Sequence, residues 1–345
     1  MQKNILLVIR ALRPSIFIPQ RCCHLQKIEE LSDLDMQTYI NEALRQEKPK
    51  SLIEPGGATE LDEIAPYLKP TFNLAAYANK SHTLQQFLKM GVDLYKIEKR
   101  KGLGQFFLEL DFEKHCKDHL MFLNDIGVSP DVFGAFITKN PLIFKESIQD
   151  LQTRVNYLEY KNFKKEAIVR IVEKNPFWLM FSTPRIDRRL GFFQKNFELT
   201  GNEVRKLATK QPRLITYNTM HVQKSIFSVK EEMGFSQDEM KRLTLKKPRI
   251  MMMNHDELLN RFEYIQKKMK LSHERILQTP ELLETRQFIL KQRHEFLKSL
   301  KRDQYDPKLP LYVPLEALVK SSNEEFVTVI AKSCMEEYEK FLKTL

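Results

Sequence analysis

The sequence predicts an all-α protein, an α-solenoid built from about six helical repeats. A proline recurs at a nearly constant interval, and apolar residues occupy the same positions around each copy. A period of about 20 to 50 residues indicates a stacked array, because no single unit can bury its own apolar face. The spacings are 35, 36, 36 and 32 residues, and the five prolines are Pro141, Pro176, Pro212, Pro248 and Pro280.

An amphipathic helix is predicted after each repeat proline. Apolar residues occur ten, fourteen and seventeen positions later, which is the i, i+4, i+7 spacing of one helix face. In the second repeat these residues are Ile186, Leu190 and Phe193. The last repeat departs from the pattern at its fourteenth position, where it has His294. An earlier unit fits the same frame with Phe106 in the place of the proline.

A shorter helix is predicted before each proline, where apolar residues lie eight and five positions upstream. Thr200-x-x-Glu203 and Ser236-x-x-Glu239 have the spacing of capping boxes, which mark helix starts. The proline ends this helix, because the residue before a proline is disfavoured in the α conformation. The apolar residues after the proline then form one tight turn. Each unit is therefore helix, proline turn, helix, and the units fill residues 86–300.

The first 28 residues have the composition of a mitochondrial presequence. They contain five basic residues and no acidic one, in an amphipathic pattern. The whole chain of 345 residues has a formal charge of +11, so about +6 remains on residues 29–345. That excess favours a polyanionic partner. We expect a protein of the mitochondrial matrix without a membrane span, in which residues 29–70 form a weakly ordered linker and residues 71–345 the repeat array with its C-terminal cap.

The repeat pattern resembles the mitochondrial transcription termination factor family. The shared features are P-x-φ-φ (φ, apolar), an apolar residue at the tenth position and an arginine at the thirteenth, and the likeness as a whole is spread over roughly residues 60–345. Further stretches that carry the resemblance are IAPY (64–67), NLAAYANKSHTLQQFLKMGVDL (73–94), LGFFQK (190–195), QYDPKLP (304–310) and the terminal EKFLKTL.

The resemblance implies a solenoid bent into a half-ring whose concave side is basic and binds nucleic acid. It further implies a mitochondrial regulator that represses transcription of mitochondrial DNA and supports assembly of the large ribosomal subunit. The implied partners are mitochondrial double-stranded DNA, large-subunit ribosomal RNA, or both.

Basic residues recur in phase with the repeat and are the candidates for nucleic-acid binding. One column lies two positions before the proline and another lies thirteen positions after it, with Ser225 as a gap in the second. A regular track of cations suits the phosphates of a nucleic acid. The candidates are Lys139, Lys174, Lys210 and Lys246 in the first column, Arg154, Arg189, Arg261 and Arg293 in the second, and Arg213, Lys247 and Arg249 around the third and fourth prolines.

Both columns also have a structural interpretation. A lysine near the end of a helix complements the helix dipole. An arginine at the flank of the apolar stripe can pack the aliphatic part of its side chain against the core and donate hydrogen bonds to carbonyl groups of a neighbouring unit.

No cofactor site, metal site or catalytic set is predicted. His115 and His119 have the spacing of a helical metal pair, but no third ligand accompanies them. No nucleophile, base and orienting residue form a set, so we expect no enzyme. The alternative to a nucleic-acid-binding regulator is a helical scaffold that recruits a mitoribosomal protein or an RNA-modifying enzyme.

Overall fold

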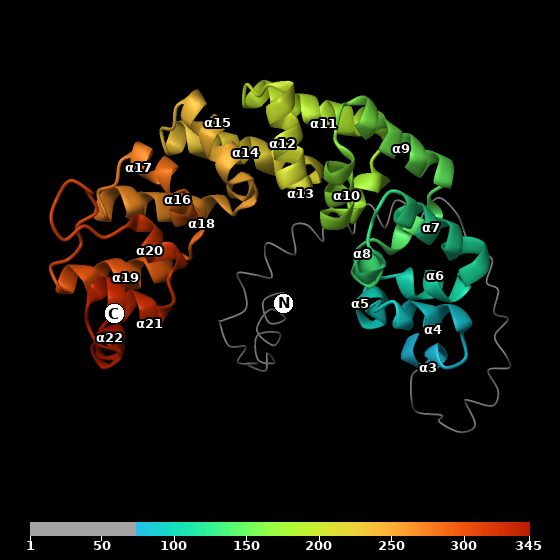
Figure 1. Cartoon of the computed structure of the whole chain (residues 1–345), viewed down its shortest axis with the longest axis horizontal. Coiled ribbons are helices and arrows are strands. Elements are labelled where there is room, and N and C mark those ends of the chain that lie inside the picture. The colour runs from blue at the N-terminus through green and yellow to red at the C-terminus, as the bar shows by residue number, and fades with distance from the viewer. Residues whose placement is uncertain (1–73) are drawn as a thin grey trace, which may run out of the picture.

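The computed structural model describes residues 74–345, and this part of the chain is helical. Within it there is no strand, and the only β-type pairing is an isolated bridge between Gln304 and Tyr312. Figure 1 shows the units following one another along an open arch, with α3 (Leu74–Ala78) and α22 (Met335–Leu342) at its two feet. The all-α solenoid and its half-ring form are therefore confirmed. The predicted presequence and linker lie outside the described residues.

Each proline-bearing unit has the predicted order of helix, turn and helix. The helices before the proline turns are α8 (Phe133–Lys139), α10 (Lys165–Lys174), α12 (Gly201–Lys210), α15 (Gln237–Lys246) and α17 (His273–Gln278). The turns are the 3₁₀ segments η3 (Pro141–Lys145), η4 (Pro176–Met180) and η6 (Pro248–Met252) and the short helices α13 (Pro212–Thr216) and α18 (Glu281–Glu284). The helices after them are α9 (Ile148–Tyr160), α11 (Thr183–Asn196), α14 (Thr219–Phe227), α16 (His255–Glu263) and α19 (Gln287–Ser299).

Further helices extend the array at both ends. Before α8 come α4 (His82–Lys89), α5 (Leu94–Glu98), α6 (Leu103–Glu109), the π-helical η1 (Phe112–Cys116), α7 (Lys117–Asp125) and the 3₁₀ turn η2 (Pro130–Val132). After α19 come α20 (Leu315–Lys320), α21 (Asn323–Glu325) and the π-helical η8 (Phe326–Ala331), followed by α22. Two more π-helical segments, η5 (Ser228–Glu232) and η7 (Tyr264–Lys268), extend α14 and α16. None of the helices in residues 74–345 has the length and apolar character needed to cross a membrane.

Side-chain caps explain why these helices begin where they do. The capping boxes of Thr200 with Glu203 and of Ser236 with Glu239 are both formed. In addition, the sixth position after the proline is the N-cap of each long helix. At Ser147, Asn218 and Asn254 the side chain accepts a backbone N–H of the first helical turn.

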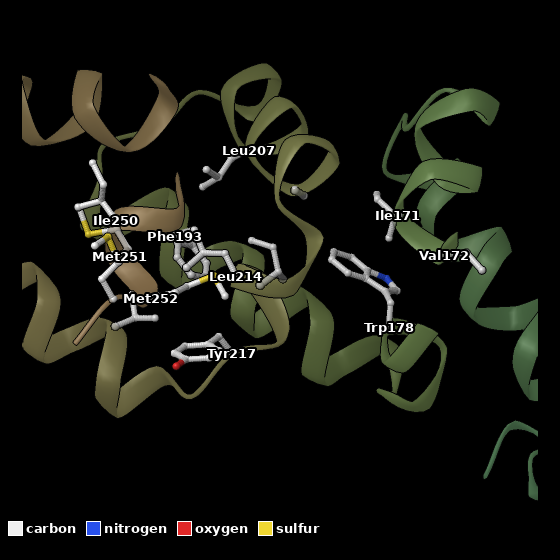
Figure 2. Close-up of a cluster of buried hydrophobic side chains, with 14 of the residues drawn as sticks. Ile171, Val172, Trp178, Phe193, Leu207, Leu214, Tyr217, Ile250, Met251 and Met252 are labelled. Carbon is white, nitrogen blue, oxygen red and sulfur yellow. The ribbon is translucent and has the colours of Figure 1, made fainter. Parts of the chain in front are cut away.

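The predicted apolar frame forms one continuous core along the arch. Ile186, Leu190 and Phe193 are all buried, and so are the corresponding residues of the neighbouring units except Ile226, which is half-buried. Figure 2 shows Phe193 of α11 beside Leu214 of α13, which belongs to the next unit, and Trp178 of η4 beside Ile171 of its own unit. Burial against the next unit is what makes the units interdependent, since apolar area removed from water supplies the main stabilising free energy.

The two exceptions of the sequence pattern have structural explanations. His294 is buried within the frame, and its Nδ1 lies 2.8 Å from the hydroxyl oxygen of Tyr305. The hydrogen bond allows a polar ring to occupy an apolar position. Phe106 lies inside α6, which continues through it because no proline interrupts the helix. Leu120 and Leu123 of that unit are nevertheless buried as the frame predicts.

Candidate nucleic-acid interface

The arginines at the thirteenth position after the proline connect each unit to the next. Arg189 Nη1 donates to the carbonyl oxygen of Ile215 at 3.0 Å, and Arg261 Nη1 donates to that of Leu283 at 2.9 Å. Arg154 makes the same contact with Leu179. These three acceptors are each the third residue after the next proline. Arg293, in the last repeat, donates to the carbonyl oxygen of Leu318 on α20 at 2.9 Å.

The gap in this column is closed by a shorter side chain. Ser225 Oγ donates to the carbonyl oxygen of Met251 at 3.0 Å, again the third residue after a proline. In the early unit, His119 occupies the thirteenth position counted from Phe106, and its Nε2 lies 2.8 Å from the carbonyl oxygen of Glu146. Arginine and serine thus make the same contact, whereas His119 reaches the fifth residue after Pro141 and not the third.

The surroundings of the arginines favour the structural interpretation of this column. Arg261 and Arg293 are only 8% and 4% exposed, and burial lowers the pKa of both guanidinium groups. Arg261 also pairs with Glu257 at 2.9 Å, and Arg154 pairs with Glu146 at 2.6 Å. A buried guanidinium whose donors are occupied by carbonyl and carboxylate oxygens presents little to a ligand.

A second set of contacts between units involves the residue before the proline, which sequence reasoning missed. Asn140 Nδ2 donates to the carbonyl oxygen of Pro176 at 3.1 Å, and Asn175 Nδ2 donates to that of Pro212 at 3.3 Å. The available signal was the repeated Asn-Pro pair at 140–141 and 175–176. Both asparagines are buried, so their amide groups require these partners.

The lysines two positions before the proline divide into two groups. Each is the last residue of its helix, as the helix-dipole interpretation expects. Lys210 Nζ donates to the carbonyl oxygens of Leu245 and Lys246, at 3.0 and 2.6 Å. Lys246 Nζ donates in turn to those of Leu277 and Gln278, at 2.8 and 3.1 Å. These two lysines cap the end of a helix in the following unit.

Lys247 is also engaged within the protein. Its Nζ lies 3.2 Å from a carboxylate oxygen of Glu281 and 3.3 Å from one of Glu284, both on α18. Burial by itself would lower the pKa of Lys247, but the two carboxylates outweigh it and the pKa is raised. Of the three lysines that flank Pro212 and Pro248, none therefore has a free ammonium group.

Four of the predicted nucleic-acid-binding residues are exposed and have charged groups without a polar partner within the described residues. Within residues 74–345, the charged groups of Lys139, Lys174, Arg213 and Arg249 have neither an ion pair nor a hydrogen bond. Arg213 belongs to α13 and Arg249 to η6, and these two elements contact each other. In Figure 1, α10 and α13 lie on the inner side of the arch. We call Lys139, Lys174, Arg213 and Arg249 the exposed basic set.

Two arginines, Arg249 and Arg286, lie close enough to the buried Arg261 to affect its pKa. Burial is the main cause that lowers the pKa of Arg261, the charge of Glu257 opposes it, and the charges of Arg249 and Arg286 add to the lowering. Arg286 is exposed and occupies the N-cap position of α19, where the preceding repeats have serine or asparagine. An arginine at the sixth position after the proline, where the other repeats have serine or asparagine, was the signal that sequence reasoning missed. Arg249 and Arg286 are thus two exposed cations near the same buried guanidinium, an arrangement that favours an anionic ligand.

The histidine pair that resembles a metal motif has other contacts. His115 Nδ1 accepts the backbone N–H of Asp111 at 2.9 Å, while His119 contacts Glu146 as described above. In the part of the chain that the structure describes, no three His, Cys, Asp or Glu side chains are grouped so that they could hold a metal ion.

Comparisons with known proteins agree with this architecture. The family model described as mTERF matches residues 74–327. The "Transcription termination factor 3, mitochondrial" of Drosophila melanogaster is 57% identical over 275 residues, which cover 80% of this chain and 78% of the relative. The proteins of the same name from Mus musculus and Rattus norvegicus are each 48% identical, over 318 and 321 residues, covering 92% of this chain and 75% of either relative. A match over most of the chain, on a solenoid with a proline turn in each unit, shows that this chain belongs to the mTERF family.

Proposed function

We propose that this chain is a nucleic-acid-binding regulator of transcription in mitochondria and acts without catalysis. Its relatives in Drosophila melanogaster and Mus musculus are named mitochondrial transcription termination factors. The acid-free, arginine-bearing residues 1–28 support import into the matrix. Binding at a promoter represses transcription by occupying the DNA.

The observation that carries the proposal is the exposed basic set. Lys139, Lys174 and Arg213 belong to three successive units, and Arg249 to the fourth, so cations are offered at repeated intervals along the arch. Their charged groups make no ion pair or hydrogen bond in the described part of the fold. Contacts of this kind bind phosphates with an affinity that depends strongly on salt and little on base sequence.

The same set of cations also fits ribosomal RNA. Phosphate groups of duplex DNA and of folded RNA offer the same charge to a lysine or an arginine. We therefore extend the proposal to large-subunit ribosomal RNA, whose binding would support assembly of the large ribosomal subunit. The phosphate-binding residues are the same for both targets.

The proposal is tested by measuring binding of the full chain to duplex mitochondrial promoter DNA and to large-subunit ribosomal RNA. Each titration is run at several salt concentrations, with unrelated nucleic acids of equal length as competitors. The double variant Arg213→Gln/Arg249→Gln is compared with Lys340→Gln/Lys343→Gln, which removes the same charge at exposed positions of the C-terminal end. We expect a steep salt dependence for the wild type, and weaker binding only for the first variant. Weak binding with no salt dependence would contradict the proposal.

A further inference from the structure

The loop between α19 and α20 exposes an unusual number of apolar side chains. Leu309, Leu311 and Tyr312 are 49%, 61% and 39% exposed, and they lie within four consecutive residues. Figure 1 shows this loop projecting from the arch beside α17. We call residues 304–313 the proline loop, after Pro307 and Pro310. Contiguous exposed apolar groups on a soluble protein mark interaction sites more often than isolated ones do.

The base of the proline loop is firmly attached to the last repeat. The backbone N–H of Val313 donates to the carbonyl oxygen of Gln304 at 2.7 Å, which closes the loop. Tyr305 is buried, its hydroxyl lies 2.8 Å from His294 Nδ1, and its carbonyl oxygen accepts from Arg275 Nη2 at 2.6 Å. A loop that is held in this way loses little conformational entropy when it binds a partner.

Leu311 is held in a backbone conformation that leucine rarely adopts. Its φ is +63°, in the left-handed region, which favours glycine. In residues 74–345, the other non-glycine residues with positive φ are Asn, Glu and Lys residues at the ends of helices, so Leu311 is the only apolar one. Because its side chain is mostly exposed, burial does not compensate for the strain. Such outliers concentrate at functional sites.

The apolar side chains of the loop are presented by a turn. The backbone N–H of Leu309 donates to the carbonyl oxygen of Asp306 at 3.1 Å, and residues 307–311 follow a turn and not an extended path. Lys301 and Lys308 are exposed, and within the described residues their ammonium groups have no ion pair. A partner groove with an acidic rim would complement them. Aliphatic side chains, in contrast, offer nothing to phosphate groups.

We propose that the proline loop is a docking element for a protein partner that has an apolar groove edged by acidic side chains. Leu309 and Leu311 enter the groove, and Lys308 pairs with its rim. The element is separate from the exposed basic set, so the protein can bind nucleic acid and this partner at the same time. The proposal does not depend on the proposed function.

The test begins with site-specific photo-crosslinking in mitochondrial extract. A photoreactive amino acid replaces Leu311 in the full chain, and a matched control carries it at Phe288, which is 53% exposed on α19. We expect a defined crosslinked protein at position 311 that is absent at position 288 and persists after nuclease treatment. Identical products at both positions, or a product that nuclease removes, would overturn the proposal.

The crosslinked protein is then purified and titrated against the full chain. We expect Leu309→Asp/Leu311→Asp to weaken binding at least tenfold, Phe288→Asp to leave it unchanged, and a synthetic peptide of residues 304–313 to compete. Leu311→Gly guards against a folding defect, because glycine tolerates the positive φ. That variant should be at least as stable as the wild type and still bind the partner more weakly. Unchanged binding by both Leu311 variants would reject the docking element.

Discussion

The guanidinium of Arg261 lies 2.9 Å from the carbonyl oxygen of Leu283, one unit further along the chain, and the arginine is almost fully buried. A charge-bearing side chain therefore contributes to the cohesion of the solenoid. The equivalent contacts of Arg154, Arg189 and Arg293 extend this arrangement over most of the arch.

Replacing Arg261 by methionine should destabilise the protein without changing its affinity for nucleic acid. The carbonyl of Leu283 would lose the hydrogen bond from Arg261 and Glu257 would lose its ion pair with Arg261, so we expect a loss of about 2 kcal/mol in the free energy of unfolding. Urea denaturation measures it, with Arg249→Met as the exposed control. Nucleic-acid binding by the folded Arg261→Met protein should equal that of the wild type. A large loss of affinity at unchanged stability would instead place Arg261 in the interface.

Removing the charges of Arg213 and Arg249 should weaken nucleic-acid binding and leave the stability of the protein unchanged. Each phosphate contact on duplex DNA contributes roughly 0.9 to the slope of log affinity against log salt, so Arg213→Gln/Arg249→Gln should lower that slope by about 2. The melting temperature should not change, because neither guanidinium has a partner in the described residues. An unaltered slope would show that these two arginines do not contact phosphate.

The four lysines that lie two positions before a proline should fall into two functional groups, although they share one position in the repeat. Lys210→Gln and Lys246→Gln remove helix-capping ammonium groups and should lower the melting temperature. Lys139→Gln and Lys174→Gln remove only a cation at the end of their own helix, so they should lower the melting temperature less and should reduce the salt dependence of binding. Thermal denaturation and salt titration of all four variants provide the comparison. The prediction fails if the two pairs behave alike.

Stability should fall as the pH drops below about 6.5, the ordinary pKa of histidine. Burial lowers the pKa of His221, His255 and His294. The folded state therefore resists protonation while the unfolded chain accepts protons, so the stabilising effect is complete above that pH and is lost below it. Melting temperatures between pH 7.5 and 5.5 measure the effect.

His255 provides a specific control for this pH dependence. Its ring stacks on His221 at 4.6 Å between centroids, and neither of its ring nitrogens has a hydrogen-bond partner within residues 74–345. Phenylalanine keeps the stacking and cannot be protonated. His255→Phe should therefore lose less stability than the wild type on acidification. An equal loss would assign the effect to the other histidines.

The repeat architecture could be predicted from the sequence because its signals are local. A proline ends a helix, and Thr200 with Glu203 starts one, whatever lies in the next unit. Burial of Ile186, Leu190 and Phe193 likewise follows from spacing alone. These features can be predicted without knowing which residues of neighbouring units contact each other.

The candidate site could be predicted only in part, because repeat position does not identify the partner of a side chain. Lys174 and Lys210 are equivalent in sequence, yet Lys210 reaches two carbonyl oxygens of the next unit while Lys174 reaches none in the described residues. Lys247 is paired only because α18 presents Glu281 and Glu284 to it. Such contacts depend on the rotation between neighbouring units, which a periodic pattern does not encode.

The donor stays thirteen residues after its own proline and the acceptor three residues after the next one, even where the interval between the two prolines shortens from 36 to 32 residues. The difference is taken up elsewhere, since α17 has six residues where α15 has ten. Excision of residues 176–211, one whole unit, would place Arg154 opposite Ile215 and leave both hydrogen-bonding groups satisfied. The arch is thus modular at the level of single hydrogen bonds, and chains of this design can gain or lose entire units by duplication or deletion at the prolines.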